Sequence, residues 1–221
     1  MCNIREVDEE MMVRGGMTAD YAEVDRITRQ GVALLTAASS ARLTAPEGTD
    51  VRMDLAGRPA FGLSGFAREP GQFSGLPDGE AAIAPVEGRT EGVVVNPYLI
   101  EKIGQVTEPF RMEVESGQIV RIEGGAQAQA LTEILGRKDP GGRNFAAELA
   151  LGTNPACRLI PKSREIKKRL GQAHVALGDN LSLAGTVDSA IHLDIILLRP
   201  TVVLDGKPVL SNGDPLFAHE P

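Results

Sequence analysis

The stretch that most constrains the fold is the apolar run at residues 191–198, which carries His192 and Asp194 within it. Its short length and its Ile and Leu content predict a strand. Alternate side chains of a strand share a face, so His192 and Asp194 should point one way and Leu193 and Ile195 the other. An imidazole beside a carboxylate can bind a divalent metal. The alternative is a buried histidine that is hydrogen-bonded to its neighbouring aspartate.

The composition narrows the classes of protein to which the chain can belong. Hydrophobic residues make up 42% and charged residues 24% of 221 residues, as in soluble globular proteins. The net charge of -7 argues against a nucleic-acid-binding surface. No apolar run approaches the roughly 20 residues that span a bilayer, and the charged N-terminal segment does not resemble a signal peptide. We therefore expect no nucleic-acid partner, no membrane segment and a cytoplasmic location.

The periodicity of apolar residues predicts a chain of strands with a few helices. Residues 19–38 have helical spacing with Thr18 as the expected N-cap, and helices are also expected at 126–135 and, capped by Ser163, at 164–170. Residues 56–80 are rich in Gly and Pro and predict a long loop, whereas 144–151 fit either a helix or a strand. Strands are expected at 41–44, 51–55, 81–85, 92–95, 110–114, 119–122, 173–177, 191–198, 201–204 and 209–210.

These elements predict an α+β fold with a large, mainly antiparallel sheet. Residues 1–17 are interpreted as an N-terminal extension, and residues 18–221 as a single metal-binding domain of catalytic type.

Three further polar residues could join His192 and Asp194. His174 lies within an apolar strand, where a satisfied core histidine is the alternative. Glu148 lies in an apolar run, where an unpaired carboxylate would cost several kcal/mol, so it needs a cation, a partner or exposure. Glu80 ends the Gly-rich loop. The alternative to metal binding is that its carboxylate is simply exposed to solvent. Together the five side chains would suit one or two divalent ions, which can activate a bound water and polarise a carbonyl.

The chain resembles the M29 metallo-aminopeptidases over roughly residues 20–213. The resemblance lies in the blocks at 76–80, 84–85, 147–155, 170–178 and 192–194, in this order along the chain. It implies a thermophilic-metalloprotease-like catalytic domain that forms a homodimer. The resemblance further implies a site for Zn, Co, Mn or Mg, at which a peptide or small amide substrate is hydrolysed. It also implies that Glu80 and Glu148 are catalytic, and that the metal ligands are Glu80, Glu148, His174, His192 and Asp194.

The chain departs from the M29 pattern in two respects. Leu181 stands where that family has a tyrosine, and we expect the chain to lack the family's N-terminal domain, which precedes the helix expected at 19–38.

The same blocks also resemble the 2,5-dihydroxypyridine 5,6-dioxygenases, through residues 65–71 and 192–195 in particular. That resemblance implies an iron held by two histidines and one aspartate. The first of those histidines aligns with Glu148 of this chain. At the positions of Glu80 and His174, those enzymes have neither a carboxylate nor an imidazole. We therefore expect a metal-dependent hydrolase of the aminopeptidase type. The alternatives are an Fe(II)-dependent ring-cleaving dioxygenase acting on a dihydroxypyridine-like substrate, and a non-catalytic relative.

Overall fold

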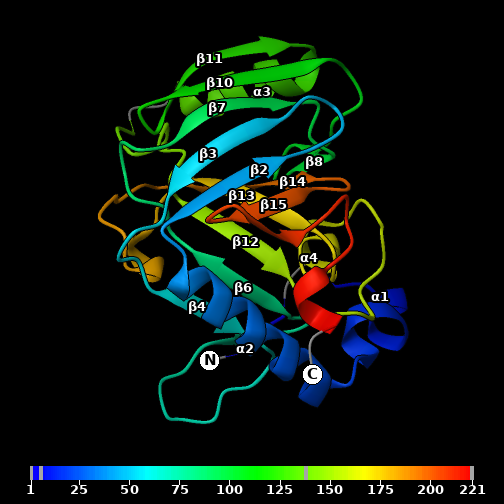
Figure 1. The fold of residues 1–221 in the computed structure, drawn as a ribbon. Helices are drawn as coiled ribbons and strands as arrows, with labels where there is room; N and C mark the ends of the chain where they lie inside the picture. Colours follow the sequence, from blue (N-terminus) through cyan, green and yellow to red (C-terminus); the bar gives the residue numbers. More distant parts are fainter. Residues whose placement is uncertain (1, 5–6, 137–138, 220–221) are drawn as a thin grey trace.

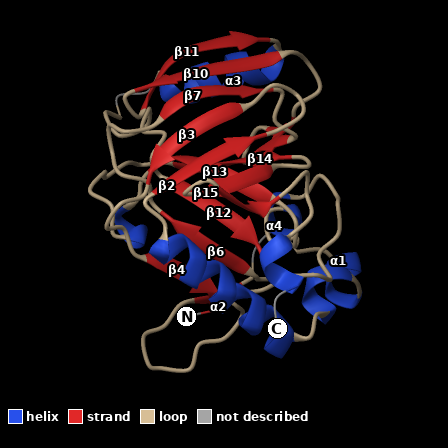
Figure 2. Cartoon of the chain, viewed as in Figure 1, coloured by secondary structure: helices blue, strands red, loops and turns tan. Residues whose placement is uncertain are grey.

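Two seven-stranded sheets share one hydrophobic core in the computed structural model, which describes residues 2–4, 7–136 and 139–219 (Figure 1). Strands dominate the chain and helices lie at its periphery (Figure 2). The predicted α+β class and its mainly antiparallel pairing are confirmed. The strands divide between two sheets, because the fold buries one face of each sheet against the other.

Sheet I is built from strands that bury alternate residues. In β2 and β10 the buried residues alternate with exposed or half-buried ones, as expected of strands with one solvent-exposed face. Its strands, in spatial order, are β11 (Gln118–Gly124), β10 (Phe110–Glu115), β7 (Glu91–Val95), β3 (Asp50–Asp54), β2 (Ser40–Thr44), β15 (Thr201–Leu204) and β16 (Lys207–Leu210).

Sheet II is buried on both faces at its centre, where every residue of β6, β12 and β13 is buried. Its strands, in spatial order, are β4 (Ala60–Leu63), β6 (Glu80–Ile83), β12 (Glu148–Gly152), β13 (Ala173–Gly178), β14 (His192–Leu197), β8 (Leu99–Ile100) and β9 (Gly104–Gln105). Neighbouring strands in both sheets are antiparallel, while β1 (Cys2–Asn3) and β5 (Ser74–Gly75) form a separate parallel pair.

The helices cover the edges of the sheets. α2 (Tyr21–Ala37) packs on β4 and β6, and α3 (Ala126–Leu135) packs on β10 and β11 (Figure 1). The shorter helices are α1 (Glu9–Val13), η1 (Gly15–Thr18), α4 (Ser163–Ile166), η2 (Leu181–Leu183) and η3 (Leu216–His219). Within the described residues, no helix combines the length and the apolar character that a membrane span requires.

Several predicted boundaries need correction. The segment 56–80 is not one loop, because β4 and β5 form within it despite its glycines and prolines. α2 is capped by Asp20, whose side chain accepts hydrogen bonds from the N–H groups of Ala22 and Glu23, rather than by Thr18. The basic helix expected at 164–170 is only the single turn of α4, with Lys162 as its N-cap. The ambiguous segment 144–151 contributes strand β12.

Candidate metal site

The register of sheet II places Glu148, His192 and Asp194 on one face. Residues directly opposite one another in an antiparallel pair project to the same side. Glu148 on β12 lies opposite Ala176 on β13, and Ala176 lies opposite Asp194 on β14. His192 precedes Asp194 by two residues and so shares its face, as the sequence predicted.

The other two candidate residues reach the same face from neighbouring strands. His174 on β13 lies opposite Ala150 on β12, which is two residues from Glu148. Glu80 on β6 lies opposite Gly152, two residues further along β12. All five predicted side chains therefore converge, while the intervening residues of these strands face the hydrophobic core.

The polar atoms of the five residues form two overlapping triads that meet at Glu148. One triad is Glu80, Glu148 and His174, and the other is Glu148, His192 and Asp194. Within each triad, one potential ligand atom per residue lies within 4.8 Å of the others. His174 Nε2 lies 3.3 Å from Glu80 Oε2 and 3.8 Å from Glu148 Oε1. His192 Nε2 lies 2.9 Å from Glu148 Oε2 and 3.4 Å from Asp194 Oδ1.

A backbone carbonyl fixes the orientation of the His192 ring on the side opposite the carboxylates. Its Nδ1 lies 2.8 Å from the carbonyl oxygen of Asp179, and a carbonyl can only accept, so Nδ1 carries the proton and donates. This leaves Nε2 facing the carboxylates of Glu148 and Asp194. Such carbonyl–histidine contacts commonly orient metal-ligating imidazoles.

Among the described residues, several buried atoms of this cluster make no hydrogen bond of normal geometry, although some of them lie 3.3–3.4 Å from an ion-pair partner. They are both ring nitrogens of His174, Oε2 of Glu80 and Oδ1 of Asp194. His174 is therefore not the satisfied core histidine considered above, and Glu80, which is only 4% exposed, is not simply solvated. Buried polar atoms that face one another in this way can share a proton or a cation, and a donor set of nitrogen and oxygen atoms suits a divalent metal.

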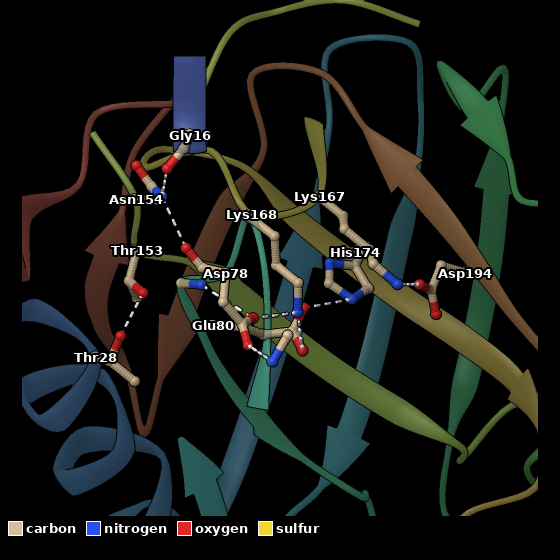
Figure 3. Close-up of polar contacts among 12 residues, drawn as sticks. Gly16, Thr28, Asp78, Glu80, Thr153, Asn154, Lys167, Lys168, His174 and Asp194 are labelled. Atoms are coloured by element: carbon tan, nitrogen blue, oxygen red, sulfur yellow. Dashed lines mark hydrogen bonds and ion pairs between the residues drawn. The ribbon is translucent and has the colours of Figure 1, made fainter. Parts of the chain in front are cut away.

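Two consecutive lysines that follow α4 complete the cluster. The Lys168 ammonium lies 3.1 Å from Asp78 Oδ1 and 2.9 Å from Glu80 Oε1, and Lys167 pairs with Asp194 (Figure 3). Lys167 also lies 3.9 Å from Glu101 Oε2. Five carboxylates thus face these two ammonium groups and the guanidinium of Arg164, which lines a pocket beside the cluster, so two net negative charges remain before the histidines are counted.

This excess of negative charge determines the protonation of the cluster. Burial by itself lowers the pKa of the His192 imidazole, but the carboxylates of Asp194 and Glu148 outweigh it and raise the pKa to about 11. Burial raises the pKa of the Asp194 carboxyl, but Lys167 and the two histidines outweigh this effect and hold it well below its usual range. A metal ion at this position must displace the His192 proton.

A pocket of about 860 Å³ opens beside the cluster. Its lining includes the almost inaccessible Glu80 and Glu148 together with His192, which we call its inner end, and more exposed side chains of α2 and of residues 61–73, which we call its outer part. Ligand sites commonly enclose about 300–1,000 Å³, so the cluster is accessible to a small molecule.

The two lysines and Asp78 were not predicted from the sequence as part of the site. Lys167 and Lys168 stand in a basic stretch, which is typical of a solvated surface. The available signal was indirect, since several carboxylates in apolar surroundings need buried cations as partners.

A family model and a curated protein relate this chain to the same group of enzymes. The model of a family described as 2,5-dihydroxypyridine 5,6-dioxygenase matches residues 7–216. The 2,5-dihydroxypyridine 5,6-dioxygenase of Pseudomonas putida KT2440 is 25% identical over 204 residues, which are 85% of this chain and 57% of that protein.

Two solved structures have a similar fold. The 2,5-dihydroxypyridine dioxygenase of P. putida KT2440 aligns with a TM-score of 0.84 at 24% identity, over 97% of this chain and 65% of that one. Wild-type AmpT from Thermus thermophilus aligns with a TM-score of 0.67 at 22% identity, over 90% and 56%. The chain thus spans about three-fifths of the length of these relatives.

The prediction of an aminopeptidase-type hydrolase, and with it the metalloprotease assignment, is wrong. The family match over residues 7–216 and the P. putida relative both point to the dioxygenase alternative. The M29 resemblance reflects a related fold, as the AmpT alignment indicates. The physical reason for the error is that one scaffold with nitrogen and oxygen ligands can serve either chemistry.

Proposed function

Because the chain belongs to the 2,5-dihydroxypyridine 5,6-dioxygenase family, we propose that it is a metal-dependent, ring-cleaving dioxygenase. Its substrate would be a hydroxylated pyridine-like ring. The proposal transfers to this chain an activity that is named for longer relatives.

The observation that carries the proposal is the convergence of five ligand-type side chains on one face of sheet II, at the inner end of a pocket. The unpartnered atoms of Glu80, His174 and Asp194 fit a bound cation. In our proposal the metal is held by residues of the two triads, namely Glu80, Glu148, His174, His192 and Asp194. Fe(II), once bound, would supply the redox chemistry that allows dioxygen to react with an aromatic ring.

The protein's own groups would bind and orient the substrate. Lys168 holds Glu80 and Lys167 holds Asp194, so both carboxylates are restrained before any ligand arrives. The backbone carbonyl of Asp179 keeps His192 Nε2 turned toward the site. Ala82 forms part of the pocket wall next to Glu80 and leaves room for a flat ring.

Oxygen consumption tests the activity. Protein loaded anaerobically with Fe(II) should consume dioxygen when a member of a panel of hydroxylated pyridines is added, 2,5-dihydroxypyridine and hydroxypyridine carboxylic acids included, with loss of the ring absorbance. Protein loaded with Zn, Co, Mn or Mg provides the comparison. His192→Gln should abolish turnover and lower metal affinity by about 100-fold or more. Asp50→Asn, at a partly exposed ion-pair residue at the end of β3 in sheet I, is the control and should retain both.

Two results would count against the proposal. One is a metal content by elemental analysis that does not differ between the parent protein and His192→Gln. The other is tight Fe(II) binding with no oxygen uptake for any hydroxylated pyridine. The predicted homodimer remains a proposal, and light scattering of the same samples would test it.

A further inference from the structure

The outer part of the pocket contains a buried aspartate between two arginines. Asp25 on α2 is 12% exposed at its side chain, and its Oδ2 lies 2.6 Å from Arg29 and 3.0 Å from Arg68. Its Oδ1 accepts hydrogen bonds from Ser64 at 2.6 Å and from Arg68 at 3.3 Å. All four residues line the pocket that also contains Glu80, Glu148 and His192. We refer to Asp25, Arg29 and Arg68 as the arginine cluster.

The arginine cluster carries one uncompensated positive charge. Burial raises the pKa of the Asp25 carboxyl, but hydrogen bonds from Arg68 and Ser64 and the charge of Arg29 outweigh this effect and lower it. One ionised carboxylate and two guanidinium groups sum to a charge of +1. Arg29 and Arg68 belong to the pocket lining, and their side chains are 68% and 51% exposed to solvent. Each guanidinium has five N–H donors, more than Asp25 can accept.

Aromatic side chains line the same pocket as this charge. Arg68 stacks over the ring of Phe66 at 4.3 Å, and Phe61 and Phe73 also line the pocket. All three phenylalanines are between 38% and 44% exposed. A flat ring entering the pocket would cover these apolar surfaces and so gain free energy from their burial.

The pocket therefore has two chemically different ends. The inner end offers the metal-type donor set, and the outer end offers guanidinium groups beside aromatic surfaces. Its volume of about 860 Å³ leaves room for a single ring with a further substituent.

We propose that the substrate of this site is a hydroxylated aromatic ring that also bears a carboxylate, which the arginine cluster binds. This inference rests on the proposed function and makes its substrate class more specific. Guanidinium groups match the geometry of a carboxylate and bind it through paired hydrogen bonds.

Matched pairs of ligands test the inference. Calorimetry should compare hydroxypyridine carboxylic acids with the corresponding carboxamides, which have the same shape without the charge, on the metal-loaded protein. The acid should bind about 10-fold tighter or more, because a carboxylate brings a negative charge to its hydrogen bonds with the guanidinium groups and the carboxamide does not. The preference should shrink as salt is added. Equal affinity for acid and amide would overturn the inference.

Variants of the arginine cluster test whether its guanidinium groups cause the preference for the acid. Arg68→Gln should remove most of the preference, Arg29→Gln should reduce it, and Arg68→Lys should retain part of it through its charge. Arg26→Gln is the control on the same helix, because Arg26 pairs with exposed Glu23 and is not part of the pocket lining. A preference that survives in the Arg29→Gln, Arg68→Gln double variant would contradict the assignment. Thermal melts of each variant check that it is folded.

The two proposals fail in different ways. Selective binding of carboxylates without oxygen uptake would remove the dioxygenase proposal and leave the arginine cluster as an acid-binding site. Oxygen uptake with equal rates for acid and amide would retain the dioxygenase and remove the acid-binding role.

Discussion

The two sheets use the same antiparallel pairing for different purposes. Sheet I alternates buried and exposed residues, and its charged side chains face water, as the Arg42–Asp50 pair does across β2 and β3. Sheet II is buried on both faces at its centre, and its charged residues Glu80, Glu148 and Asp194 are almost inaccessible to solvent. Sheet II can carry these charges only because each is matched by a lysine, a histidine or, as we propose, a metal.

The comparison shows that the residues of sheet I contribute to stability, whereas the ionisable residues that could bind a metal lie on sheet II. One face of sheet II contributes to the core that it shares with sheet I, and only its other face carries the ionisable cluster. Substitutions in sheet I should therefore change the free energy of unfolding and leave metal affinity unchanged, while substitutions around the cluster should change both.

The largest effect is expected from Lys168→Met. Removing this ammonium leaves the carboxylates of Asp78 and Glu80 buried without their cation, which costs about 3–5 kcal/mol of unfolding free energy. Urea unfolding measures the loss, and added divalent metal should restore part of it. Lys162→Met removes an exposed partner of Asp8 and serves as the control. A loss below about 1 kcal/mol in Lys168→Met would show that sheet II tolerates unpaired charge.

A smaller or equal effect, confined to stability, is expected from Leu43→Ala. Leu43 is fully buried on β2, and its truncation should cost about 2–5 kcal/mol. Metal affinity measured on the folded variant should equal that of the parent protein. A change in metal affinity would mean that the two layers are coupled more strongly than their separate faces suggest.

The smallest effect is expected from Asp205→Asn at the β15–β16 turn. Asp205 accepts hydrogen bonds from the N–H groups of Ser39 and Ser40 and from the Ser40 hydroxyl. These bonds lower the pKa of its carboxyl below the ordinary value of 3.8. Its stabilising contribution is therefore present above that value and is lost as the pH falls through the lower pKa of the folded state.

Thermal melts of the parent protein and Asp205→Asn, from about pH 7 down to about pH 2, check this expectation. The difference in Tm should be present at neutral pH and should shrink in the acid range. A difference that stays constant with pH would mean that the hydrogen-bonded carboxylate is not its source.

Much of the fold follows from local patterns. The spacing of Val24, Ile27, Gly31 and Leu35 predicts α2 because the buried face of a helix repeats every three to four residues. The turn at Ser116–Gly117 follows from its residues, since both adopt the positive φ that a tight hairpin requires. β4 was not predicted because its stability comes from pairing with β6, which lies about 20 residues away.

The site was predictable only in part. His192 and Asp194 share a face because of strand periodicity, which is visible in the sequence. The positions of Glu80, Glu148 and His174 followed from resemblance to known families rather than from spacing. The pairings of Lys168 with Glu80 and of Arg68 with Asp25 depend on the tertiary fold, and no local pattern encodes them.

Small residues separate the charged groups of sheet II. Ala82, Ala150, Gly152 and Ala176 stand in the same rows of the sheet as Glu80, His174, Glu148 and Asp194. Of these four residues, Ala82 lines the pocket, so its methyl group limits the space there. Exchanging Ala82 for valine would narrow that space while every charge stayed in place, so the range of molecules accepted would change by a few carbon atoms without alteration of a single ligand.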